Sequence, residues 1–538
     1  MIHRHLPTVR PQWICPGNDS EASHTYPSAP TPIHPILLIL VLLLCFPATA
    51  WAQEPDLGTE AQRAAGRDIY LHKCAQCHGE HGDGAGYAAP FLRPEPRDFT
   101  AGTFKFRSSA SGELPTDEDL HRSIRNGMPY TSMPAWKGIL SDDEITNVVY
   151  FLKTFASDFS GPFGIPEMAS IPDKAPGYDA DHLARGRKVF EENQCTDCHG
   201  NMGRGNGKST PTLEDQWGKH IRPADMTKRW TFRNGQTRLD IYRTFTTGLD
   251  GSPMPSYDMP EADRWALVDY VWSLSQPEPE YATVVFSQAV DGPLVVTRGD
   301  SLFAGVRPAL FPVVGQVIEP GRAFHPGVNA VEVRAVHNRE EIAFRVSWHD
   351  MTAETTGHNA PDLAAPVYDA AHPDTTAGFS DAVAVQVPAK TPEGTELPYF
   401  LFGDRKNAVD LWFIDLAGNR TAQYLGKGFD EIEPAEAHFS ATAHYDDGEW
   451  TAVFKRKLSV DGGLSFTEGT FVPIAFSVWD GFDRERGNRR GITSWYQVYV
   501  EPMERPSTTG PVLAYGLVTL LLGLGLVGVV RWRYGRHE

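Results

Sequence analysis

The chain has 538 residues, of which 41% are hydrophobic and 22% are charged, a composition typical of globular proteins. Its length suggests several folding units rather than one core. The formal net charge of −19 argues against a nucleic-acid partner, because phosphate backbones are bound by clusters of Lys and Arg.

The first 52 residues have the layout of a secretory signal peptide. Arg4 and Arg10 precede the short apolar run at 36–46, and the small residues Ala50 and Ala52 follow it. This order of charged, apolar and small residues predicts export and cleavage after Ala52. An uncleaved membrane anchor is the alternative, although the apolar run is short for a membrane span.

Two Cys-x-x-Cys-His motifs follow, "CAQCH" with Cys74, Cys77 and His78, and "CTDCH" with Cys195, Cys198 and His199. This is the attachment motif of c-type haem, in which the thiols form thioethers and the histidine binds the iron. A redox Cys-x-x-Cys leaves the two histidines unexplained. A zinc ribbon is also disfavoured, because 117 residues separate the two cysteine pairs. The motifs therefore predict two covalent haem c groups.

The two motifs belong to an internal repeat with an offset of 121 residues between Cys74 and Cys195. Each copy begins with a helix that carries Gly-Arg and an aromatic residue, at 66–70 and 186–190, and we expect these glycines to allow a close helix crossing. Each copy ends with an apolar-faced helix, predicted over 141–155 and 260–274. In the first of these, Ser141 and Glu144 form the pattern of a capping box.

The repeat also selects the second axial ligand of each iron. Met128 and Met133 both precede proline, but only Met133 has a counterpart in the second copy, Met254. Each of these two methionines lies 59 residues after the first cysteine of its motif, whereas Leu249 stands at the position equivalent to Met128. We predict the axial pairs His78/Met133 and His199/Met254, and Met128 is the alternative ligand in the first copy.

Residues 57–157 and 179–276, joined by a linker at 158–178, resemble two class I cytochrome c domains. The resemblance implies small all-α folds with His/Met axial ligation, and methionine sulfur raises the reduction potential of the iron. Arg97 follows a proline and Arg222 precedes one in aligned segments of the two copies. Both are candidates to pair with haem propionates. A plain surface role is the alternative for both.

Residues 280–505 have a different pattern, with short runs such as "AVEVRAV", "AVAVQVP" and "FVPIAFSVWD" separated by turn residues. Alternation with a period of two predicts an antiparallel β-sandwich. The segments "VSWHDMT", "FSDAVAVQVP" and "IAFSVWDGFDRERGNRRGITSWYQV" resemble the ethylbenzene dehydrogenase haem-binding domain, found in γ subunits of molybdenum enzymes. The resemblance implies an antiparallel sandwich that binds haem b between a Met and a Lys.

This chain departs from that family at both ligand positions, where it has Phe402 and Arg490. Neither residue can bind iron, since phenylalanine has no donor atom and arginine stays protonated. Haem b is therefore doubtful, and the domain has either lost its haem or holds it differently. The substitute ligands that we consider are His349, Met351, Lys406 and Lys455.

Near the end, residues 512–530 form an uncharged apolar run of 19 residues, long enough for a transmembrane helix. Arg531, Arg533 and Arg536 follow, and positive charge marks the cytoplasmic side. We expect a single C-terminal anchor in the bacterial cytoplasmic membrane, with the body of the protein on the periplasmic face.

These features favour a non-catalytic electron-transfer protein of a respiratory chain, because two irons with both axial positions filled leave no open site for a substrate. The expected partners are redox proteins, either a molybdenum oxidoreductase or a respiratory complex. A di-haem peroxidase-like enzyme is one alternative. A cytochrome with a ligand-binding β module is the other, in which Trp412, Trp479 and Trp495 line a site.

Overall fold

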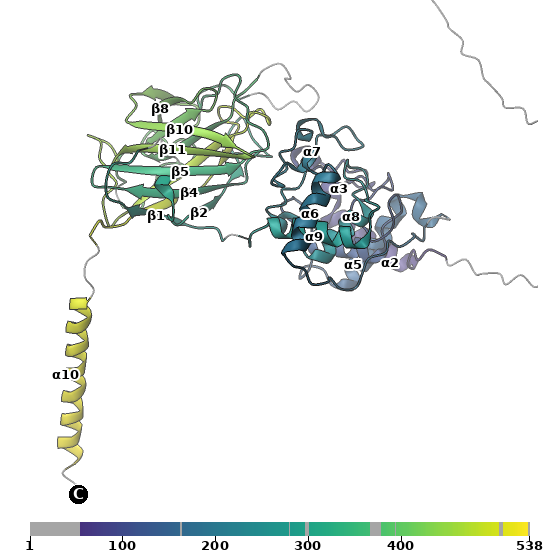
Figure 1. The fold of residues 1–538 in the computed structure, drawn as a ribbon, viewed down its shortest axis with the longest axis horizontal. Helices are drawn as coiled ribbons and strands as arrows, with labels where there is room; N and C mark the ends of the chain where they lie inside the picture. The colour runs from purple at the N-terminus through teal and green to yellow at the C-terminus, as the bar shows by residue number, and fades with distance from the viewer. Residues whose placement is uncertain are drawn as a thin grey trace, which may run out of the picture. The chain divides into compact units, whose positions relative to one another are not determined.

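The structure is a computed structural model that describes residues 54–161, 164–278, 280–295, 301–365, 378–392, 394–504 and 509–535. The predicted signal peptide lies outside these residues. Helices come first, then a domain of strands, then one long helix (Figure 1).

The first helical copy is built from α2 (Glu60–Lys73), α3 (Ala75–His78), α4 (Asp117–Asn126) and α5 (Asp142–Leu152). The second copy repeats this order with α6 (Ala180–Glu192), α7 (Thr196–His199), α8 (Arg238–Thr247) and α9 (Glu261–Leu274). Short 3₁₀ turns are η1 (Ala89–Phe91), η2 (Lys153–Phe155), η3 (Ser157–Ser160), η4 (Thr210–Thr212) and η5 (Arg229–Thr231). The helical class predicted for both copies is confirmed.

The ends of the helices follow from local sequence. The side chain of Ser141 accepts a hydrogen bond from the backbone N–H of Glu144, and the side chain of Glu144 accepts one from the backbone N–H of Ser141. The predicted capping box is therefore present. The apolar stripe of this helix is buried at Ile145, Val148, Val149 and Leu152. In the second copy Pro260 is the residue before the helix, and α9 begins at Glu261.

The first and last helices of each copy cross closely, as expected from the glycines. A Cβ on Gly66 would collide with the backbone carbonyl of Asn147 in α5. A Cβ on Gly186 would collide in the same way with the carbonyl of Ala266 in α9. The two glycines thus allow backbone-to-backbone contact that no other residue permits.

The β domain contains the strands β1 (Val284–Ala289), β2 (Ala309–Pro312), β3 (Val314–Gly315), β4 (Ala330–His337), β5 (Glu341–His349), β6 (Ala382–Pro388), β7 (Val409–Asp415), β8 (Arg420–Gly426), β9 (Ile432–Ala435), β10 (Phe439–Asp446), β11 (Glu449–Lys457), β12 (Phe471–Trp479), β13 (Gly491–Ile492) and β14 (Tyr496–Val500). Their order along the main path is β10-β11-β5-β4-β1-β14-β12-β6-β7-β8-β9. The first half of β12 pairs with β14 and its second half pairs with β6. This strand therefore belongs to both layers of the β domain.

The two layers pack face to face around a shared apolar core. Phe344 of β5 and Trp412 of β7 lie 6.2 Å apart between ring centroids, and both are buried. The predicted sandwich is therefore present, but the sheet is mixed rather than purely antiparallel. β1 is parallel to both of its neighbours, β14 and β4. The expectation failed there because alternation reveals a strand but not the direction of its neighbour.

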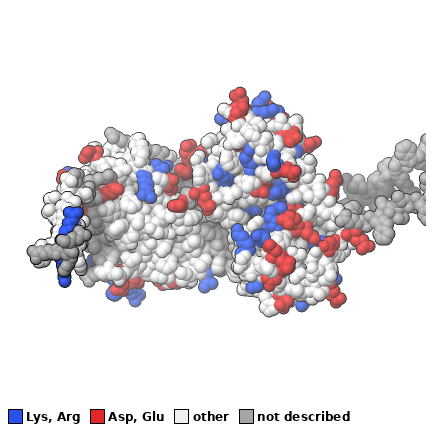
Figure 2. Space-filling model, turned by 90° about the horizontal axis from the view of Figure 1, so that it is seen from below, with Lys and Arg blue, Asp and Glu red and all other residues white. Residues whose placement is uncertain are grey.

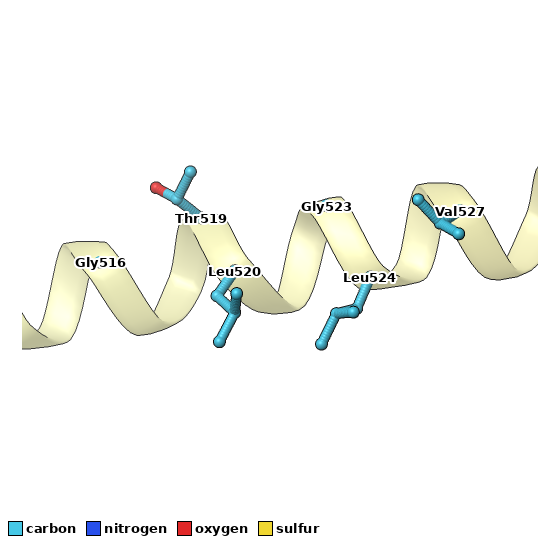
Figure 3. A pocket seen from close by; sticks show the side chains of 6 residues that line it. All are labelled: Gly516, Thr519, Leu520, Gly523, Leu524 and Val527. Atoms are coloured by element: carbon cyan, nitrogen blue, oxygen red, sulfur yellow. The ribbon is translucent and has the colours of Figure 1, made fainter.

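Helix α10 (Thr509–Tyr534) follows the β domain and is drawn in yellow in Figure 1. Among the described residues, Gly510–Tyr534 is the helix that is long and apolar enough to cross a membrane. Gly516 and Gly523 leave a shallow hollow along it, lined by Thr519, Leu520, Leu524 and Val527 (Figure 3). This hollow is open along the side of one exposed helix, so it does not form a redox site.

Candidate haem centres

The two histidines of the Cys-x-x-Cys-His motifs lie at equivalent points of the two copies. His78 ends the single-turn helix α3 and His199 ends α7. The next residues, Gly79 and Gly200, have φ of 76° and 74°, a conformation that glycine adopts without strain. The chain therefore turns sharply just after each imidazole.

Each imidazole is oriented by a backbone carbonyl. The Nδ1 of His78 lies 3.2 Å from the carbonyl oxygen of Arg97, and the Nδ1 of His199 lies 3.0 Å from that of Ala224. When Nδ1 donates its proton to the carbonyl, Nε2 is left with a lone pair, as a metal ligand requires. Burial lowers the pKa of both histidines, which keeps the rings neutral.

The four cysteines beside these histidines are free thiols in the described part of the chain. Burial raises the pKa of Cys74 and of Cys195 to about 11, so both sulfurs are protonated at neutral pH. Cys77 and Cys198 are half-buried. In neither copy are the thiols joined in a disulfide, so both pairs remain available for thioether bonds.

The methionine loops of the two copies share one hydrogen-bond pattern. The backbone N–H of Met128 donates to the carbonyl of Met133 at 3.0 Å, and that of Leu249 donates to Met254 at 3.0 Å. A hydroxyl at the same place in each loop, on Thr131 or Ser252, donates to the carbonyl of Met128 or Leu249. Met128 is thus structurally equivalent to Leu249, and Met133 to Met254.

A glycine closes the base of each methionine loop. Gly127 and Gly248 have φ of 63° and 67°. A Cβ on either one would press on the backbone after the methionine, at Pro134 or Pro255. The backbone after each methionine is therefore held against the end of the preceding helix, α4 or α8.

The cations around the first motif fit a negatively charged ligand. The Nη1 of Arg97 is buried and has no hydrogen-bond partner in the structure. Burial, with the nearby Arg97, lowers the pKa of Lys105 to about 8. Two crowded cations with an unpartnered nitrogen are suited to a haem propionate. The interpretation of Arg97 as a propionate partner therefore fits the structure.

Arg222, the other candidate, pairs with protein carboxylates instead. Its Nη2 lies 2.9 Å from Asp483 and 3.3 Å from Asp480, both in the β domain. These carboxylates raise the pKa of Arg222. The propionate interpretation of Arg222 does not hold in this arrangement.

A buried arginine links the first copy to the methionine loop of the second. The fully buried Arg107 forms an ion pair of 2.7 Å with Asp250 and donates to the carbonyl of Thr247 at 2.6 Å. Asp250 also accepts a bond from the backbone of Gly112. The sequence analysis missed this role, because the partner of Arg107 lies in the other copy.

In the β domain, the two positions where the family places haem ligands contact each other. The guanidinium carbon of Arg490 lies 3.6 Å from the ring centroid of Phe402, and both side chains are fully buried. A porphyrin bound between two axial ligands needs that space, so the residues present there do not fit haem b. Burial lowers the pKa of Arg490 to about 9, still basic enough to keep it charged at neutral pH.

Three of the four substitute ligands that we considered have other partners. Lys406 pairs with Glu396 at 2.7 Å, and Lys455 pairs with Glu341 at 2.9 Å. His349 lies 2.6 Å from the carbonyl of Arg204. Met351 is buried. None of the contacts above brings two of these four residues together as axial ligands.

The tryptophans considered as a binding surface are largely core residues. Trp412 and Trp479 are 1% and 0% exposed. Trp495 is half-buried and donates to the carbonyl of Pro398 at 2.8 Å. The ligand-binding alternative therefore loses two of its three aromatic residues.

Comparisons with known families agree with this organisation. Residues 61–152 match the family of cytochrome c oxidase, cbb3-type, subunit III, and residues 183–275 match cytochrome c. Residues 300–429 match the ethylbenzene dehydrogenase family, in which haem b is expected. The two cytochrome c domains indicate covalent haem c.

Three known proteins are similar to parts of the chain. A putative respiratory nitrate reductase haem subunit of Haloferax mediterranei is 29% identical over 38% of this chain and 65% of its own length. Chlorate reductase subunit gamma of Ideonella dechloratans is 30% identical over 33% of this chain and 70% of its own length. The cbb3-type cytochrome c oxidase subunit FixP of Bradyrhizobium diazoefficiens is 30% identical over 39% of this chain and 61% of its own length. The chain thus spans slightly under two thirds of the first and third relatives.

Proposed function

We propose that this chain, which belongs to the family of haem subunits that includes chlorate reductase subunit gamma, is a membrane-attached electron carrier with two c-type haems. One observation carries the proposal: the two copies repeat the same carbonyl-oriented histidine and the same hydrogen-bonded methionine loop. An iron with ligands on both faces exchanges electrons without binding a substrate.

In this proposal Cys74 and Cys77 hold the first haem, and Cys195 and Cys198 hold the second. His78 and His199 supply the proximal nitrogens. Met133 and Met254 supply the sulfur on the other face, which raises the potential relative to a second histidine. When bound, each haem supplies one-electron redox chemistry, and the chain positions it, tunes it and shields it from water.

The partner class follows from the relatives and from the family of the β domain. The Ideonella relative is a subunit of chlorate reductase, and the Haloferax relative is named as a haem subunit of nitrate reductase. We infer that a molybdenum oxidoreductase is the redox partner of this chain, and that a respiratory complex such as a terminal oxidase is the second candidate. Acidic and basic side chains are mixed over the helical part of the face in Figure 2, a surface suited to a protein partner.

The proposed location is supported by the C-terminal helix. The helix Gly510–Tyr534 would cross the bacterial cytoplasmic membrane, and Arg531 and Arg533 would lie on the cytoplasmic side. The haem domains would then lie on the periplasmic face, where c-type haems are attached.

The proposal is tested by purifying the tagged full chain from detergent-solubilised membranes and identifying what accompanies it. We expect a molybdenum-containing oxidoreductase that reoxidises the dithionite-reduced haems when its own electron acceptor is added. Recovery of a terminal oxidase instead would assign the chain to the second partner class. Peroxide-dependent turnover together with a high-spin haem would overturn the electron-carrier proposal in favour of a peroxidase.

A further inference from the structure

Three buried carboxylates converge at one end of the β domain. Asp350 follows the last residue of β5, Asp381 precedes β6, and Asp480 follows β12. The pairing of Trp479 with Ala382 brings the end of β12 beside the start of β6. One oxygen from each of the three carboxylates lies within 4.8 Å of the others, and the three residues are 4%, 0% and 2% exposed.

One nearby cation does not balance these carboxylates when they are ionised. Glu354 adds a fourth carboxylate that acts on Asp350 and Asp381, whereas Arg222 is the nearby cation. Burial and mutual repulsion raise the pKa of Asp350 well above its ordinary value and raise that of Asp381 to about 9. Four carboxylates around one guanidinium are costly to bury without a further cation.

One carboxylate oxygen of this cluster has no hydrogen-bond partner. The Oδ2 of Asp350 is buried and accepts no hydrogen bond, while its Oδ1 accepts one from the backbone of Thr352. Buried oxygens of native proteins are normally paired, so the Oδ2 of Asp350 indicates a missing partner.

We propose that Asp350, Asp381 and Asp480 bind a calcium ion in the β domain. Calcium takes six to eight oxygen ligands, including carboxylates and hydroxyls, and tolerates irregular geometry. Magnesium demands a near-ideal octahedron and retains several waters, which a buried all-protein carboxylate cluster suits less well. The proposal goes beyond electron transfer and does not depend on it.

The ion would stabilise a junction next to the second haem site. Asp480 pairs with Arg222, which lies two residues before Ala224, and the carbonyl of Ala224 accepts the bond from His199. His349, next to Asp350, contacts the carbonyl of Arg204 in the same cytochrome copy. The proposed ion therefore joins three strand ends at the place where the β domain meets this copy.

The experiment uses the haem-loaded full chain in detergent. We expect the purified protein to retain about one calcium per chain by elemental analysis. We also expect a calcium chelator to lower the unfolding temperature of the β domain by about 5 °C, and added calcium to restore it. The proposal would be overturned if the protein contains no bound calcium and its unfolding temperature changes neither with the chelator nor with added calcium.

A matched pair of variants identifies the ligands. Asp350→Asn keeps the Oδ1 acceptor for Thr352 but weakens the ligand, so calcium affinity should fall at least about tenfold by calorimetric titration. Asp461→Asn, in an exposed loop, should bind calcium like the wild type. Equal affinity in both variants would place the ion elsewhere, and an equal response to magnesium would overturn the choice of calcium. If Asp350→Asn does not fold, calcium content and the chelator response of the wild type decide the matter.

Discussion

The guanidinium of Arg490 lies over the ring of Phe402, with 3.6 Å between its central carbon and the ring centroid. Ser477 and Asn488 accept hydrogen bonds from the same guanidinium at 3.2 Å and 2.7 Å. A cation on an aromatic face in a desolvated site contributes about 2 kcal/mol. Two residues that cannot bind iron have therefore formed a contact of their own where the family binds haem.

The haem content of the purified chain follows from this contact. We expect a pyridine haemochrome assay to give two c-type haems per chain and no b-type haem. The reason is that Phe402 and Arg490 occupy the space between the family's ligand positions. A b-type band that an acid-acetone extraction removes would contradict the prediction.

The axial methionines can be separated by substitution. Met133→Leu and Met254→Leu should each remove about half of the sulfur-to-iron charge-transfer absorption, since each supplies one of two sulfurs, and each should lower the potential of one haem. Met128→Leu is the matched control and should leave the spectrum unchanged, because Leu249 already occupies the equivalent position. A Met133→Leu protein with the full band would move the ligand to Met128.

The helix crossing of the second copy should not tolerate a side chain. Gly186→Ala places a methyl group against the carbonyl of Ala266, and the helices must separate. We expect a loss of about 1–3 kcal/mol in the free energy of unfolding, the usual cost of overpacking. Gly177→Ala, which has open space around it, should unfold like the wild type in the same denaturant titration.

The link from Arg107 to the second methionine loop should be important for that loop. Arg107→Ala leaves Asp250 without its buried partner, and we expect a loss of about 3 kcal/mol. On heating, the sulfur-to-iron charge-transfer absorption that depends on Met254 should then disappear before the one that depends on Met133. Arg125→Ala breaks an exposed pair with Asp142 and should cost less than about 1 kcal/mol. Simultaneous loss of both absorptions in Arg107→Ala would show that the link does not act on the loop.

Acid should destabilise the fold partly through His325. Burial, together with Arg93 and Arg489, lowers the pKa of this histidine from 6.5 to about 4. Between these two pH values His325 binds a proton in the unfolded chain but not in the folded chain. The free energy of unfolding therefore falls as the pH drops from about 6.5 to about 4. His325→Gln should remove about 1–3 kcal/mol of that loss, allowing for partial solvent access. His438→Gln, an exposed histidine, should show the wild-type pH profile in the same unfolding experiment.

The helical half could be predicted well because its signals are local or repeated. Ser141, Glu144 and the apolar positions of α5 lie within one segment of sequence. The repeat also favoured Met133 over Met128 as the predicted ligand, and the Met133 loop has the same backbone hydrogen bond as the Met254 loop. The assignment of the eight haem residues remains a prediction.

The features that escaped prediction depend on contacts between distant segments. Asp350, Asp381 and Asp480 each stood in a recognised strand segment, but strand pairing brings them together and alternation does not encode pairing. The parallel position of β1 was missed for the same reason. Arg107 needs a partner in the other cytochrome copy, which no pattern within one copy reveals.

The pairing of β1 with β14 also has a mechanical meaning. The chain from the haem domains enters β1 near Val284, and the chain to α10 leaves β14 at Val500. Because the strands are parallel, tension between the haem domains and an anchored α10 would pull them past each other along their length. Their hydrogen bonds would share such a load in shear instead of opening one at a time, so the first and last strands form a clamp against stretching.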